Sequence, residues 1–210
     1  MQYRRFGKLD WQVSALGFGT MRLPHIGNNM AEVNEAEAAR MIQYAIDHGI
    51  NYIDTAYSYQ DGRGESIVGR MLKETGNKVK VATKLPSWMV GSPKDFDRFL
   101  DEQLKRLQRN QVDFYLLHGL NRKTWAKLLD FNVLSWAETA LADGRIGHLG
   151  FSFHDDFTVL KEIVDAYDKW TLCQIQYNYM DENYQAGKRG LQYAASKGLA
   201  VVIMEPLRGG

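Results

Sequence analysis

Residues 48–54 read HGINYID, in which a polar residue and a glycine precede a short apolar run. The same order recurs in residues 143–152, DGRIGHLGFS, and in residues 197–204, KGLAVVIM. Glycine just after a helical pattern is typical of a helix end, so each stretch predicts a helix followed directly by a strand. Short apolar strands that alternate with helices indicate parallel strands joined by crossover helices.

Apolar periodicity predicts the other elements around these stretches, beginning with a hairpin over residues 2–14. Strands are expected over residues 16–20, 51–54, 79–84, 112–118, 148–153, 172–176 and 199–204. The first helix begins after an N-cap at Asn34 and ends at Gly49. Further helices are expected around residues 67–72, 93–107, 122–143, 156–168 and 184–197.

Seven strands with polar residues at their carboxyl ends favour an α/β fold of the (β/α)8 TIM-barrel type over an open doubly wound sheet. Residues 17–24, GFGTMRLP, have the wrong glycine spacing for a dinucleotide fingerprint and no helix directly behind them. Such a barrel needs an eighth strand and usually roughly 250 residues. We therefore expect residues 1–210 to form a single barrel domain without its C-terminal part.

The composition suits a globular domain with a sizeable core, because 45% of the residues are apolar and 24% are charged. A net charge of +1 gives no electrostatic case for nucleic acid or an anionic membrane. The longest apolar run, residues 199–204, is far too short to span a membrane, and the N-terminus lacks a signal-peptide pattern. One cysteine, Cys173, allows no intrachain disulfide, so we expect a cytoplasmic protein.

Four polar side chains of different chemistry lie at or just past the ends of predicted strands. Asp54 ends one strand and Tyr59 follows it, Lys84 ends VKVATK, and His118 ends VDFYLLH. An unpaired buried carboxylate is costly, so Asp54 needs a positive partner. Singly, these residues have ordinary explanations as a helix cap, a surface lysine or a core histidine. Together, at one end of a parallel barrel, they predict one site.

These residues and their spacing resemble the catalytic tetrad of the aldo-keto reductases. The resemblance covers the whole chain and includes residues 3–21, YRRFGKLDWQVSALGFGTM, GES at residues 64–66 and GFS at residues 150–152. It implies reduction of an aldehyde or ketone by hydride transfer from a nicotinamide cofactor. NADP is the family's default, although NAD stays open. Residues 118–121, 150–156 and 204–210 further resemble a branch whose members often carry a C-terminal extension with iron–sulfur clusters.

The resemblance assigns a role to each of the four residues. Tyr59 would donate the proton to the carbonyl oxygen, and His118 would donate to or polarise that oxygen. A lysine ammonium beside a phenol favours the phenolate, and Asp54 would hold Lys84 charged and oriented. The family pattern places the acid at the second tyrosine, so Tyr57 is expected to be a wall residue.

The resemblance also implies where the cofactor would bind. Ser152 and Gln174 match residues beside the nicotinamide carboxamide. Two departures weaken the match, because Phe153 stands where many members carry asparagine and Met204 where many carry an aromatic that stacks on the nicotinamide. The full predicted cofactor set is Thr20, Met21, Asp54, Ser152, Gln174, Leu207 and Gly209.

No catalytic metal is expected, because Asp61, Glu65 and His154 lack a recognisable ligand spacing. An iron–sulfur cluster is expected only in an extension outside these residues. Trp88 and Trp125 fit the pocket wall and ordinary packing equally well.

Two other functions stay open: a non-catalytic relative that binds nicotinamide to sense or regulate, and a phosphate-handling barrel isomerase. A barrel that lacks a strand also has open edges, so residues 1–210 alone are expected to self-associate and to bind NADPH weakly.

Overall fold

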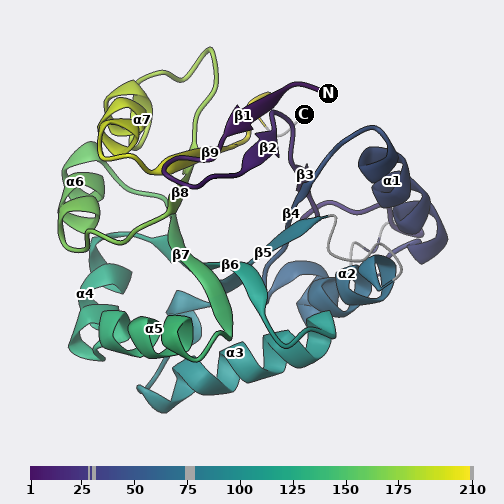
Figure 1. Ribbon diagram of the computed structural model, residues 1–210, viewed down its shortest axis with the longest axis horizontal. Helices are drawn as coiled ribbons and strands as arrows, with labels where there is room; N and C mark the ends of the chain where they lie inside the picture. The colour runs from purple at the N-terminus through teal and green to yellow at the C-terminus, as the bar shows by residue number, and fades with distance from the viewer. Residues whose placement is uncertain (28, 30–31, 74–78, 209–210) are drawn as a thin grey trace.

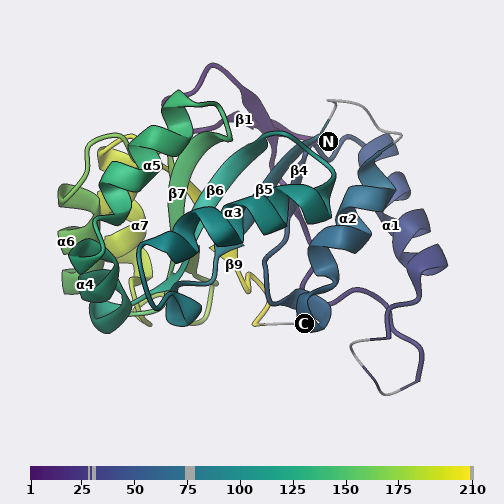
Figure 2. The ribbon, with the colours of Figure 1, turned by 90° about the horizontal axis from the view of Figure 1, so that it is seen from below.

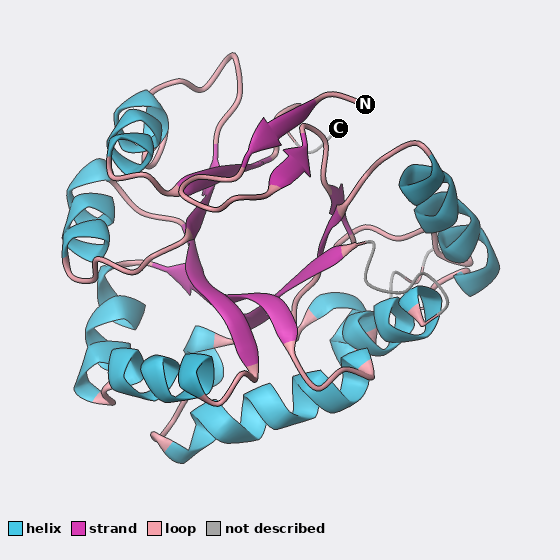
Figure 3. Cartoon of the chain, in the orientation of Figure 1, coloured by secondary structure: helices cyan, strands magenta, loops and turns pink. Residues whose placement is uncertain are grey.

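The computed structural model describes residues 1–27, 29, 32–73 and 79–208. Within these residues, one sheet contains seven parallel strands in chain order, and it curls into an open ring with the helices on its outer side (Figures 1 and 3). The predicted fold class is therefore confirmed. The strands are β3 (Phe18–Gly19), β4 (Tyr52–Asp54), β5 (Lys80–Leu85), β6 (Val112–Leu120), β7 (Ile146–Phe153), β8 (Leu172–Gln176) and β9 (Ala200–Met204).

Helices follow the strands and bury one apolar face each against the sheet. Asn34 caps the first of them, as predicted, because its side chain accepts a hydrogen bond from the backbone N–H of Glu37. The helices are α1 (Glu35–Asp47), α2 (Gly64–Leu72), α3 (Lys94–Leu107), α4 (Arg122–Asp130), α5 (Val133–Ala142), α6 (Phe157–Asp165) and α7 (Gly187–Ser196).

The hairpin of β1 (Tyr3–Arg5) and β2 (Gln12–Ser14) confirms the predicted N-terminal hairpin and covers the amino ends of the strands. Its turn inserts Phe6, whose ring lies 5.0 Å from Phe114 between centroids. Gly7 has a φ of +57°, and a Cβ there would lie 2.6 Å from the backbone nitrogen of Ala200. Only glycine therefore lets the turn touch β9. Figure 2 shows the hairpin at one end of the ring.

Side chains alternate across each strand, so the sheet has an inner and an outer layer. On β5, Val81 packs outward in the large core under the helices, whereas Ala82 packs inward with the hairpin. Above the inner apolar layer, toward the carboxyl ends, the inward side chains turn polar at Asp54, Lys84 and Gln174. This polar layer is where the predicted site lies.

Several predicted bounds differ from the structure by one to three residues, and three differences need comment. Residues 122–143 form two helices, because Asn132 adopts a left-handed φ of 58° that interrupts the helical hydrogen bonds. The first core strand is only Phe18–Gly19. Strand β6 continues past His118 to Leu120, with a register irregularity between Leu117 and Leu120.

Each edge strand of the described sheet, β3 and β9, pairs on one side only. The side chains of Val201–Met204 are correspondingly half-buried, whereas every residue of the neighbouring β8 is buried. Among the helices that the structure describes, none is long and apolar enough to cross a membrane.

Candidate active site

Lys84 lies at the centre of the predicted tetrad and is almost fully buried, at 1% exposure. Its Nζ donates to Asp54 Oδ1 at 2.5 Å and to the backbone oxygen of Thr55 at 2.8 Å. Strands β4 and β5 are neighbours in the sheet, with Asp54 in register with Ala82, so the two side chains enter the same interior layer. The ammonium therefore has a buried counter-ion and a second acceptor.

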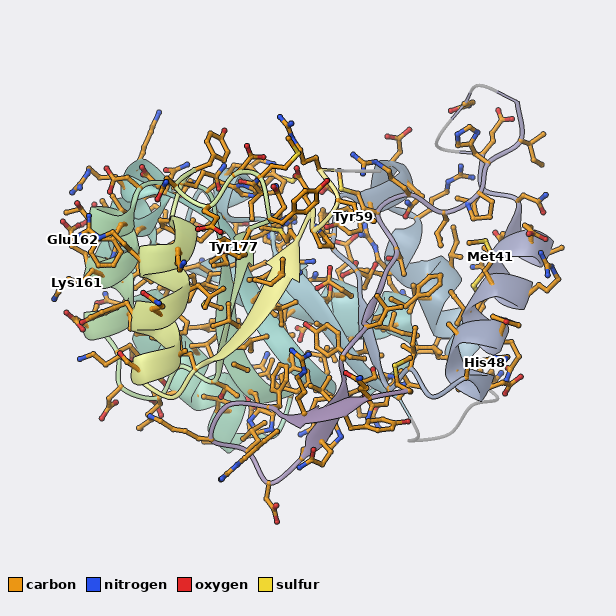
Figure 4. The ribbon with its side chains drawn as sticks, turned by 90° about the horizontal axis from the view of Figure 1, so that it is seen from above. Met41, His48, Tyr59, Lys161, Glu162 and Tyr177 are labelled. Atoms are coloured by element: carbon orange, nitrogen blue, oxygen red, sulfur yellow. The ribbon has the colours of Figure 1, made fainter. Side chains whose placement is uncertain are left out.

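Tyr59 opens the 3-10 turn η1 (Tyr59–Gly62), and Lys84 Nζ reaches its hydroxyl oxygen at 3.5 Å. Figure 4 places Tyr59 at the end of the ring to which the β9 arrow points, away from the hairpin. Tyr57 points elsewhere: its hydroxyl donates to Glu102 on α3, and its ring packs edge-on against Phe99. The expectation that Tyr57 is a wall residue of the site is therefore wrong.

The charge of Lys84 is favoured by its surroundings. Burial, the largest single effect, opposes the ammonium, but the Asp54 carboxylate and the Tyr59 phenol outweigh it and raise the pKa of Lys84 above its ordinary value. Lys84 is thus protonated throughout the neutral range and places a fixed positive charge beside the Tyr59 hydroxyl.

His118 lies beside Tyr59, with ring centroids 6.2 Å apart in an edge-on arrangement. Burial, then Lys84 and His154, lower the pKa of His118 to about 3, so its imidazole is neutral at pH 7. Its Nδ1 is buried and has no hydrogen-bond partner among the described residues. The register irregularity of β6 falls at this residue, and such bulges are common where a strand re-aims a side chain at a site.

The two tryptophans left open by the sequence have different surroundings. Trp88 is 50% exposed and its ring centroid lies 5.0 Å from that of His118, so it borders the site. Trp125 is buried in the outer core against Trp170, which is ordinary packing.

Gln174 and Ser152 are paired in register on β8 and β7, and both are buried. Gln174 Nε2 donates to Asp54 Oδ2 at 3.1 Å, while its Oε1 is buried without a partner in the described residues. Ser152 Oγ accepts from the backbone N–H of Gly119 at 2.7 Å, which leaves its own proton to donate. One unpaired acceptor and one available donor match the N–H and C=O groups of a nicotinamide carboxamide.

The other predicted cofactor residues are spread along the same end of the sheet. Thr20 is fully buried, and its hydroxyl donates to the backbone oxygen of Asp54. Met21 and Leu207 are 54% and 69% exposed, so their side chains make little contact with the rest of the chain. Gly209 lies outside the described residues.

The two departures from the family pattern have different consequences. Phe153 is fully buried in the outer core, edge-on to Phe151, so it points away from the interior layer. Met204 follows the inward residues Ala200 and Val202 at alternate positions and is half-buried, so it faces the interior.

Gln60, the residue after Tyr59, makes contacts near the site that the sequence does not predict. Its Nε2 donates to the backbone oxygens of Thr20 and Met21 at 2.9 and 2.8 Å, while its backbone adopts a left-handed φ of 49°. The amide therefore ties the turn that carries Tyr59 to the loop after β3. The sequence gives no hint of it, because a left-handed glutamine cannot be recognised without tertiary contacts.

The cavities among the described residues include one at each end of the sheet. One of about 310 Å³ lies past the carboxyl ends of β8 and β9, between Gln176, Asp181 and Arg208. The larger one, about 520 Å³, lies at the amino end of β5 beside Lys80 and Asp113, far from Tyr59. The described residues contain no cluster of three acidic, histidine or cysteine side chains that could hold a metal.

Comparison with known proteins assigns the family. A model of the aldo/keto reductase family matches residues 15–210. The chain belongs to the aldo-keto reductase family. The uncharacterized oxidoreductase YrpG of Bacillus subtilis is 30% identical to this aldo-keto reductase over an alignment of 231 residues, which covers 100% of this chain and 68% of YrpG.

Solved aldo-keto reductases have the same fold. AKR11C1 from Bacillus halodurans, in its holo form, matches with a TM-score of 0.79 and 26% identity, over 97% of this chain and 65% of that one. An aldo-keto reductase from Klebsiella pneumoniae in complex with NADPH matches with a TM-score of 0.78 and 26% identity, over 98% of this chain and 68% of that one. The chain thus spans 65–68% of the lengths of these three proteins.

Proposed function

We propose that the protein is an oxidoreductase that reduces an aldehyde or ketone with a nicotinamide cofactor. Family membership supports the oxidoreductase role, and the contacts of Lys84 carry the finer proposal. A buried ammonium contacts both the Asp54 carboxylate and the Tyr59 hydroxyl, and this arrangement suits the phenol to donate a proton to a carbonyl oxygen.

NADPH is the proposed cofactor, and when bound it supplies the hydride, which no side chain can provide. The NADPH complex of the Klebsiella pneumoniae relative supports this choice. Ser152 and Gln174 would hold the carboxamide through the available hydroxyl proton and the unpaired Oε1. Thr20, Met21, Leu207 and Gly209 stay proposed contacts, with Asp54 beside them.

The proton has a defined source in this proposal. Tyr59 donates its hydroxyl proton to the carbonyl oxygen as that oxygen gains negative charge. The Lys84 ammonium stabilises the phenolate that remains, and Asp54 keeps the ammonium oriented. His118 is neutral, so one of its ring nitrogens donates a hydrogen bond to the same oxygen without supplying a proton.

The remaining proposals follow from the same assignment. We propose one barrel domain over residues 1–210, a cytoplasmic location, a small carbonyl compound as the partner and no catalytic metal. Family membership removes the support for a phosphate-handling isomerase. A non-catalytic relative that binds nicotinamide stays the alternative, since such a protein would share the fold and the cofactor site.

Transfer of deuterium from NADPH to an aldehyde tests the proposal. The protein is incubated with NADPH deuterated at the transferring C4 position and a set of simple aldehydes, and the products are examined by NMR. We expect one deuterium on the carbinol carbon of the alcohol. NADPH binding measured by fluorescence, with no labelled alcohol from any aldehyde, would indicate the non-catalytic alternative instead.

A further inference from the structure

A buried polar network lies on the outer face of the sheet, directly behind Lys84. Glu65 of α2 is fully buried and accepts hydrogen bonds from Thr83 Oγ1 and from Gln103 Nε2 of α3. The same Gln103 nitrogen donates to the backbone oxygen of Lys84 at 2.9 Å, and its Oε1 accepts from Tyr115. Each member is therefore satisfied by another member of the network.

The network joins the segments that carry the phenol and the amine. Helix α2 follows the turn of Tyr59 after a single residue, and its Glu65 bonds to Thr83, the residue before Lys84. Arg106 of α3 adds a second tie, since it pairs with Glu65 Oε2 at 3.3 Å and donates to the backbone oxygen of Tyr57. Neighbouring residues of a strand face opposite sides, so Thr83 points outward while Lys84 points inward.

Burying the Glu65 carboxylate costs desolvation free energy, so this residue is not explained by packing alone. Burial raises the pKa of Glu65 even though Thr83, Gln103 and Arg106 all donate to it. An apolar residue in the same place would pack against the outer core without that cost. An apolar residue at position 65 would, however, make no hydrogen bond to Thr83, so α2 could shift relative to the end of β5. The distance of 3.5 Å between Lys84 Nζ and the Tyr59 hydroxyl depends on how these two elements are placed.

We propose that Glu65, Thr83 and Gln103 are positioning residues, which set the distance between the Lys84 ammonium and the Tyr59 hydroxyl from behind the sheet. They touch neither substrate nor cofactor. The inference rests on the proposed function for its kinetic consequence, whereas its structural consequence can be measured without turnover.

The test compares Thr83→Val with Thr83→Ser. Valine keeps the branched shape and removes only the hydroxyl donor to Glu65, whereas serine keeps that donor. A shift of about 1 Å at a reacting group costs on the order of 10²-fold, so a smaller shift predicts a fall in kcat between about 10-fold and 10²-fold for Thr83→Val. The KM for the aldehyde and the Kd for NADPH should stay unchanged, and Thr83→Ser should restore most of kcat.

A stability control and a second readout keep the outcome clear. Ile163→Val, on the buried face of α6, lowers Tm without touching the network and should keep wild-type kcat. The titration midpoint of the Lys84 side chain, followed by NMR without substrate, should change in Thr83→Val but not in Ile163→Val. An unchanged titration and an unchanged kcat in Thr83→Val would overturn the inference. A wild-type protein without turnover would refute the proposed function alone, and the titration would then decide the positioning role.

Discussion

At the scale of single residues, the site depends on one buried lysine. Replacing Lys84 with methionine keeps its length but leaves Asp54 without its counter-ion. Stranding a buried charge typically costs about 3–5 kcal/mol, so we expect a large loss of stability together with loss of activity. Lys80 offers the control, since it is a half-exposed lysine of the same strand that pairs with Asp113.

Urea unfolding of both variants measures the difference. Lys80→Met should cost no more than about 1 kcal/mol, as is usual for partly exposed ion pairs. Equal losses in Lys84→Met and Lys80→Met would show that the Lys84 contact has no special weight.

His118 makes the free energy of unfolding depend on pH. Burial first, and then Lys84 and His154, lower the pKa of His118 from about 6.5 to about 3. Between these values the unfolded chain binds a proton that the folded chain does not, so stability is full above pH 6.5 and falls as the pH drops toward 3. The slope is up to about 1.4 kcal/mol per pH unit.

Replacement of His118 by glutamine should flatten this acid loss, as measured by Tm between pH 7 and pH 4. His48, an exposed histidine directly after α1, provides the matched control substitution. Identical slopes in wild type and His118→Gln would contradict the buried, neutral imidazole.

At the scale of elements, the hairpin closes the amino end of the ring through one glycine. Gly7 and Gly27 have nearly the same φ, +57° and +61°, so alanine strains both backbones alike. At Gly7 the new Cβ would lie 2.6 Å from the backbone nitrogen of Ala200, whereas at Gly27 no atom of the described residues lies within 4 Å. Gly27→Ala should cost about 1–2 kcal/mol in urea unfolding, and Gly7→Ala clearly more. Equal costs would mean that the hairpin turn does not seat against β9.

The elements also show what the sequence could predict. The strand pattern alone predicts that Asp54 and Lys84 lie together, because parallel strands end at one edge of a sheet. It does not predict the break at Asn132, because the apolar periodicity runs through this residue and a left-handed backbone leaves no mark in composition. The outward turn of Tyr57 and the hydrogen bonds of Gln60 cannot be predicted from the sequence either, since both depend on contacts with distant segments.

At the scale of the whole molecule, the ring is open between β3 and β9 in the described residues. Unpaired strand edges with half-buried apolar side chains promote association, so we expect the protein to self-associate. Light scattering across a range of concentrations checks this. A single monomeric species at every concentration would contradict this expectation.

The central claim is that Tyr59, and not the neighbouring phenol, delivers the proton under the influence of Lys84. Comparing Tyr59→Phe with Tyr57→Phe tests it most directly, because each variant removes one hydroxyl and only Tyr59 contacts Lys84. The quantity to measure is the single-turnover rate of aldehyde reduction at saturating NADPH, with NADPH binding followed by fluorescence. We predict a fall of about 10²–10⁴-fold for Tyr59→Phe with binding retained, and a near wild-type rate for Tyr57→Phe. A near wild-type rate in Tyr59→Phe would contradict the account.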